Sequence, residues 1–120
     1  MSVRLRSDIW VDAYRRRCEI AGGYAVLRRR GAAEAGAVFI RVDRLDGRVA
    51  LYGPAPQTAF GEGDTERRFV RLHAEETIDV PRSEERIAKE LRFDSDLWIV
   101  EVEDRQGRTF LLPEEATEGP

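Results

Sequence analysis

The stretch AVFIRVDRLDGRVALYG (residues 37–53) decides the fold, because two strand-like runs flank a polar turn that contains a glycine. Valine, isoleucine, phenylalanine and tyrosine favour strands, and the polar DRLDGR segment between them favours a tight reversal of the chain. The pattern predicts an antiparallel hairpin whose turn lies between Asp43 and Arg48, with Gly47 supplying a positive φ.

The register of this hairpin depends on its turn. If Asp43 faces Arg48, then Ile40 pairs with Leu51. Because side chains alternate between the two faces of a strand, this register predicts one apolar face and one mixed face, so we expect one deeply covered and one partly covered face. The apolar face contains Val38, Ile40, Val42, Val49 and Leu51, and the mixed face contains Ala37, Phe39, Arg41, Ala50 and Tyr52.

Helical and strand-like segments surround the hairpin. Ser7 can cap a helix that ends at Gly22-Gly23, and Ser83 can cap a second, shorter helix. Residues 24–30 and 67–73 have strand-like alternation, and a second hairpin is expected around residues 104–107. The sequence therefore predicts one α+β domain over residues 1–113, in the order α-β-β-β-β-α-β-β, with a mostly antiparallel sheet.

Three further expectations concern the arrangement of the chain. We expect the two helices on opposite faces of the sheet, with both helices on one face as the alternative. Residues 53–66 have no periodicity and carry glycine, proline and acidic residues, which predicts a mobile loop. Residues 114–120 are predicted to be a frayed acidic tail.

Both tryptophans follow a Ser-Asp-aliphatic tripeptide, in SDIW (residues 7–10) and SDLW (residues 95–98). The first copy begins a segment of helical periodicity, and the second begins a segment of strand periodicity. A duplicated ligand-binding motif would need equivalent surroundings in both copies, and these two copies begin different kinds of secondary structure. We therefore expect Trp10 and Trp98 to be core residues rather than parts of a repeat.

Composition and missing motifs exclude several classes of function. The 120 residues carry a net charge of −3 with one cysteine and one histidine, and no apolar run approaches the roughly 20 residues of a membrane helix. No export signal is evident, so we expect a cytoplasmic protein that does not act on a membrane. Phosphate loops, dinucleotide fingerprints and nucleophile elbows are also missing, and Cys18 lies on an apolar helix face. We expect no metal site, no cofactor and no catalytic residue.

Five polar residues form the best candidate binding site. They could hold a carboxylate or a phosphate, because guanidinium groups bind both and the other side chains add hydrogen bonds. The alternative is that the two arginines pair with acidic residues of the protein itself. The five residues are Arg41, Tyr52, Gln57, Arg71 and His73.

Three functions remain open. The first is a small binding or adaptor module for a protein or a small anionic partner, where a second copy of the chain is one candidate protein partner. The second is a small enzyme with a site formed by residues 53–66, Arg71 and His73. The third is a nucleic-acid binder, because residues 1–50 have eleven arginines against six acidic residues. The acidic second half of the chain disfavours this third function.

Three strings, RLRSDIWV, VDRLDGRVALYGPAPQ and ELRFDSDLWIVEVEDRQGR, carry a family resemblance. Together they resemble a short alphaproteobacterial family of uncharacterised proteins (domain of unknown function, family fourteen-ninety-one). The resemblance covers nearly the whole chain and implies a single domain. It implies no activity and no functional residues.

Overall fold

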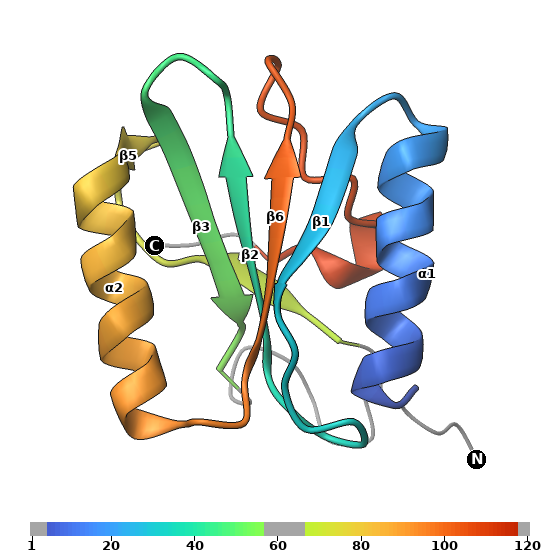
Figure 1. The fold of residues 1–120 in the computed structure, drawn as a ribbon. Helices are drawn as coiled ribbons and strands as arrows, with labels where there is room; N and C mark the ends of the chain where they lie inside the picture. The colour runs from blue at the N-terminus through green and yellow to red at the C-terminus, as the bar shows by residue number, and fades with distance from the viewer. Residues whose placement is uncertain (1–4, 57–66, 118–120) are drawn as a thin grey trace.

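A six-stranded mixed sheet lies between two α-helices in the computed structural model, which describes residues 5–56 and 67–117 (Figure 1). The strand order is β1-β6-β2-β3-β4, with the short β5 paired to β3. All pairs are antiparallel except β2 with β6. The elements are α1 (Ser7–Ile20), β1 (Tyr24–Arg29), β2 (Val38–Asp43), β3 (Arg48–Pro54), β4 (Phe69–Arg71), β5 (Ile78–Asp79), α2 (Val80–Phe93), β6 (Trp98–Glu103) and the 3-10 helix η2 (Pro113–Glu115).

The predicted α+β class and the mostly antiparallel sheet are confirmed. The last predicted strand is wrong, because the chain after β6 does not form a strand in the described residues. The carboxylate of Asp104 accepts hydrogen bonds from the backbone N–H and the guanidinium of Arg108, at 2.8 and 2.7 Å. The segment then leaves the sheet and crosses to α1, where the Tyr14 hydroxyl donates to the carbonyl of Thr109 at 2.6 Å.

Each helix packs against a different face of the sheet. Side chains of α1 form one cluster with Val38, Ile40 and Val42 of β2. Ile87 of α2 forms a second cluster with Phe39 of the same strand. Because alternate residues of a strand point to opposite faces, the two clusters lie on opposite sides of the sheet, as Figure 1 shows.

Both tryptophans are buried in the α1 cluster, as the sequence predicts. Their indole N–H groups need partners, because a buried donor without one is costly. Trp10 Nε1 donates to the Glu115 carboxylate at 3.0 Å, and Trp98 Nε1 donates to the carbonyl of Ala32 at 2.8 Å. The Trp10 ring also stacks on Tyr14, with 4.9 Å between the ring centroids.

The predicted register of the β2–β3 hairpin is wrong by one residue. Asp43 pairs with Val49, so Ile40 pairs with Tyr52 and Arg41 pairs with Leu51. Since directly paired residues share a face, Tyr52 lies on the α1 side of the sheet. Arg41 lies on the α2 side.

The turn explains this shift. It contains five residues, 44–48, closed by a hydrogen bond of 3.1 Å from the Arg44 N–H to the Arg48 carbonyl. Leu45 and Gly47 both have a positive φ, 65° and 87°. The side chains of Asp43 and Asp46 stabilise this path by accepting backbone hydrogen bonds two residues onward, at 2.7 and 2.9 Å.

The two predicted serine caps are also wrong. Ser7 is the first residue of α1, and its hydroxyl donates to the carbonyl of Gly36 at 2.6 Å. The α2 helix begins three residues earlier than Ser83, and its N-cap is Asp79, which accepts from the Arg82 N–H at 2.8 Å. Both serines are fully buried within helices instead, where their hydroxyls bind carbonyl groups.

The end of the chain differs from the predicted frayed tail. Glu115 is buried and accepts from Trp10, from Arg17 at 2.8 Å and from the Leu112 N–H at 2.9 Å. Residues 113–115 form η2, and residues 118–120 lie outside the described residues. Of the predicted mobile loop, Gly53 and Pro54 belong to β3, and residues 57–66 lie outside the described residues.

We predict that replacing Trp10 or Trp98 with alanine lowers the free energy of unfolding by about 3–5 kcal/mol, because each change leaves a large cavity in one cluster. Urea denaturation followed by circular dichroism measures the loss. Phe93→Ala is the matched control, because its aromatic ring is exposed on α2, and we expect a change below about 0.5 kcal/mol. Equal losses in all three variants would contradict the assignment of the core.

Candidate functional site

The guanidinium of Arg41 is buried beneath α2 and is occupied by the protein's own side chains. It donates to both carboxylate oxygens of Glu101 at 2.9 Å and to the Ser83 hydroxyl at 3.0 Å. Arg41 and Glu101 are direct partners in the parallel pairing of β2 with β6. The donors of Arg41 are thus used within the protein, in the way that the alternative of pairing with an acidic residue describes.

Two further charges extend this ion pair into a network. The Arg28 side chain on β1 contacts Glu84 of α2 and donates to Glu101 at 2.8 Å. Glu84 also lies 3.4 Å from Arg41, counted from carboxylate oxygen to Nε. The hydrogen bond from Arg28 lowers the pKa of Glu84 and raises the pKa of Arg28 itself. The network links β1, β2, β6 and α2, so we assign it a structural role.

His73 is buried and both of its ring nitrogens are used. Nε2 accepts the backbone N–H of Leu51 at 3.0 Å, which places the proton of the neutral ring on Nδ1. Nδ1 then donates to the carbonyl of Glu75 at 2.8 Å. Burial, the largest effect, lowers the pKa of His73 below its ordinary value of 6.5. The predicted use of His73 in a binding or catalytic site is therefore not supported by its surroundings.

Tyr52 and Arg71, two of the predicted site residues, lie side by side in the structure. They pair directly across β3 and β4, on the α1 side of the sheet. Arg71 is held in place by hydrogen bonds of 3.0 Å from Nε to the His73 carbonyl and from Nη2 to the Ala74 carbonyl. Gln57 lies outside the described residues.

Two residues that sequence reasoning missed complete this surface. Arg44 and Glu76 form an ion pair of 3.0 Å, and both affect the titration of Tyr52. Burial raises the pKa of Tyr52 most strongly, Arg71 and Arg44 lower it, and Glu76 raises it. We call Arg44, Tyr52, Arg71 and Glu76 the Tyr52–Arg71 surface. Arg44 belongs to the turn of the first hairpin, where the sequence gives no signal that its side chain reaches the sheet.

The Tyr52–Arg71 surface can bind an anion. It contains two guanidinium groups, one phenolic hydroxyl and the Glu76 carboxylate that pairs with Arg44, so several donors and a net positive charge remain. Carboxylates and phosphates accept hydrogen bonds from such groups. Within the described part of the chain, no three or more His, Cys, Asp and Glu side chains gather to hold a metal ion. None of the described helices is long and apolar enough to cross a bilayer.

We predict that the single histidine titrates below pH 6.5, because protonation would remove the acceptor that binds the Leu51 N–H. An NMR titration of its ring protons measures this pKa directly. The unfolded chain would bind the proton first. The stability contributed by neutral His73 is therefore complete above about pH 6.5 and is lost as the pH falls toward the folded pKa.

The His73→Gln variant is the control for this pH dependence, since glutamine does not titrate. Its free energy of unfolding should change less than that of the wild type between about pH 6.5 and 5. A His73 pKa at or above 6.5 in the folded protein would show that the ring is not held neutral.

Comparison with known proteins identifies relatives of known structure. The sequence model of a family described as "Protein of unknown function (DUF1491)" matches residues 5–112. The comparison with curated proteins gives no match.

Two of these relatives cover almost the whole chain. The solution structure of protein Atu0922 from A. tumefaciens is 40% identical, with a TM-score of 0.80 and 98% of each chain covered. A crystal structure of a DUF1491 family protein from Caulobacter crescentus is 38% identical, with a TM-score of 0.76, and covers 94% of this chain and 99% of the other. The chain therefore belongs to the DUF1491 family of proteins of unknown function.

Proposed function

We propose that this protein is a binding module that recognises a carboxylate-rich segment of a partner protein through the Tyr52–Arg71 surface. The observation that carries the proposal is the direct pairing of Tyr52 with Arg71 on the α1 side of the sheet, with Arg44 close enough to affect the phenol. Tyrosine and arginine are enriched among the residues that dominate binding energy at protein interfaces.

The positions of the charges support this choice. Many arginines of the described residues are neutralised by nearby acidic groups, as Arg28 and Arg41 are by Glu84 and Glu101. Arg71 instead donates to two backbone carbonyl groups, which orient its guanidinium without cancelling its charge. An incoming carboxylate would therefore meet an oriented cation, and less side-chain entropy would be lost on binding.

The alternative functions have weaker support. The enzyme hypothesis relied on residues 53–66, Arg71 and His73. Residues 57–66 lie outside the described residues, and both nitrogens of the His73 ring are already hydrogen-bonded. The nucleic-acid hypothesis relied on arginines of the first half acting together. Arg28 is paired with acidic residues on the α2 side, whereas Arg15 and Arg16 lie on α1. These arginines do not form one cationic face, which phosphate-backbone binding would need.

We predict that a six-residue polyglutamate peptide binds the protein and that Arg71→Gln weakens this binding about tenfold, because one charge-assisted hydrogen-bonding group is lost. Arg44→Gln and Tyr52→Phe should each give a smaller loss, because Arg44 already pairs with Glu76 and the phenol of Tyr52 carries no charge. Isothermal titration calorimetry at low salt measures the affinities, and NMR shifts of residues near Tyr52 locate the site. Arg92→Gln is the control, since Arg92 is an exposed arginine of α2.

A second titration distinguishes recognition of a carboxylate-rich peptide from binding of a free anion. Titration with sodium phosphate should give weaker binding at the same residues, because a small ion makes fewer contacts than a chain of carboxylates. The proposal is wrong if Arg71→Gln and Arg44→Gln bind the peptide as tightly as Arg92→Gln. Thermal melts of each variant show whether the fold is retained.

A further inference from the structure

The outer face of α1 carries apolar side chains that the protein itself does not cover. Ile9 and Ile20 are 50% and 81% exposed, and Ala13 and Arg16 lie between them on the same face. The spacing 9, 13, 16 and 20 repeats every four and three residues, which is the spacing of helix positions that contact another helix. This face points away from Trp10, Tyr14 and Cys18, which are buried in the core.

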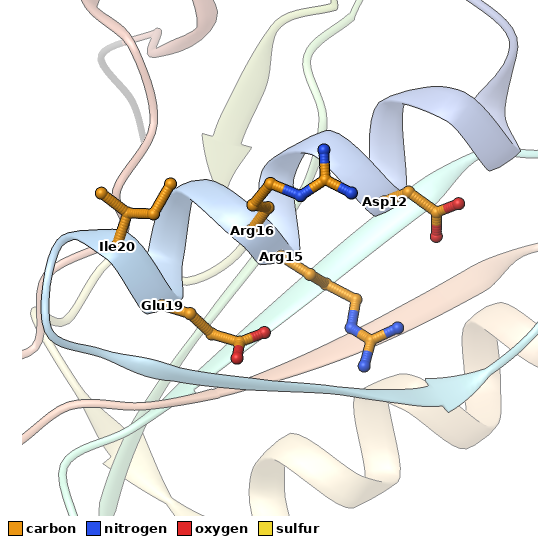
Figure 2. Close-up of a pocket in the computed structure, with 5 residues that line it drawn as sticks. All are labelled: Asp12, Arg15, Arg16, Glu19 and Ile20. Carbon is orange, nitrogen blue, oxygen red and sulfur yellow. The ribbon is translucent and has the colours of Figure 1, made fainter.

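Four charged residues lie beside this face of α1. They are Asp12, Arg15, Arg16 and Glu19. Their side chains make no ion pair and no side-chain hydrogen bond with the described residues. They line a hollow of about 550 Å³ together with Ile20 (Figure 2). Figure 2 shows Arg15 and Glu19 extending on the side of α1 that faces β1, with Asp12 and Arg16 further round the helix.

We propose that two copies of this chain associate through the outer faces of their α1 helices, packed antiparallel about a two-fold axis. In this arrangement Ile9 of one copy lies against Ile20 of the other, and Arg16 of one copy lies beside Asp12 of the other. Each contact occurs twice, as a two-fold axis requires. Ala13 lies opposite Arg16 and leaves room for its side chain. A parallel arrangement would instead place the two Arg16 groups together.

The mixture of acidic and basic side chains on the outer face of α1 favours a second copy of this chain as its binding partner. The face presents two acidic and two basic side chains, so it can complement itself. A strongly acidic partner would be repelled by Asp12 and Glu19, and a strongly basic one by Arg15 and Arg16. This proposal is independent of the one for the Tyr52–Arg71 surface, because the two surfaces share no residue.

The size of the face predicts a weak dimer. The 14 residues of α1 span about 21 Å, so a single helix pair buries less than the area of a standard stable interface. Sedimentation equilibrium of the full chain should therefore show an average mass rising from 13.7 kDa toward twice that value as the concentration approaches about 1 mM. A mass that stays at 13.7 kDa over this range would overturn the proposal.

A matched pair of variants tests the apolar contacts. Ile20 and Phe93 have nearly equal exposure, 81% and 80%, but Phe93 lies on α2. We expect Ile20→Ser to raise the dissociation constant at least about tenfold and Phe93→Ser to leave it unchanged. An equal effect of the two changes, or none from Ile20→Ser, would exclude this face as the contact.

Charge reversal tests the pairing of Arg16 with Asp12. Arg16→Asp alone and Asp12→Arg alone should each weaken association, because like charges then meet across the two-fold axis. An equimolar mixture of the two variants should associate at least as strongly as the wild type, since one copy is acidic where the other is basic. A folding defect could not produce this recovery. No gain in the mixture over each variant alone would overturn the proposed arrangement.

Discussion

The buried charge of Arg41 is the constraint on which the rest of the structure depends. A guanidinium in the central strand β2, 7% exposed, must be neutralised and hydrogen-bonded, because an unpaired charge there would cost several kcal/mol. Glu101 supplies the countercharge from β6, where it is the direct partner of Arg41 in the parallel pairing with β2. The α2 helix covers the pair and contributes Ser83 and Glu84.

This constraint also determines which side chains remain available for binding. With Arg41 directed toward α2, the hairpin register places Tyr52 on the opposite side of the sheet. Tyr52 then meets Arg71 of β4 and lies within the electrostatic influence of Arg44. The Arg41–Glu101 ion pair and the proposed binding residues Tyr52 and Arg71 thus lie on opposite sides of the sheet. The outer face of α1 forms a further surface, distinct from both.

Local patterns were sufficient to predict most elements of this fold. The apolar periodicity of α1, the alternation around Val38 and Ile40, and the burial of both tryptophans all follow from residues near in sequence. The register of the β2–β3 hairpin depends on the left-handed backbone conformation of Leu45. Leucine rarely adopts this conformation, so the sequence of the turn did not indicate it. A single extra residue in that turn moved Tyr52 to the other face, and the predicted site of five residues was divided with it.

Long-range polar contacts account for the other differences. Nothing near Asp104 in the sequence indicates that the following segment crosses to α1, because its partners there are Tyr14 and Arg17. Likewise, the buried position of Glu115 depends on Trp10, 105 residues away in the chain. The neutral state of His73 depends on the Leu51 N–H of a neighbouring strand. Such contacts form only when the fold is complete, so local sequence patterns do not reveal them.

A double-mutant cycle on Arg41 and Glu101 tests the central role of this ion pair most directly. Each single change, Arg41→Met or Glu101→Gln, should lower the free energy of unfolding by about 1.5–3 kcal/mol, because the remaining charge loses its bidentate partner and keeps only a secondary one, Arg28 beside Glu101 or Glu84 beside Arg41. The double variant should lose clearly less than the sum, with a coupling energy of at least about 1.5 kcal/mol from urea denaturation. Additive losses, with coupling below about 0.5 kcal/mol, would contradict the account, because the two charges would then contribute to the fold independently.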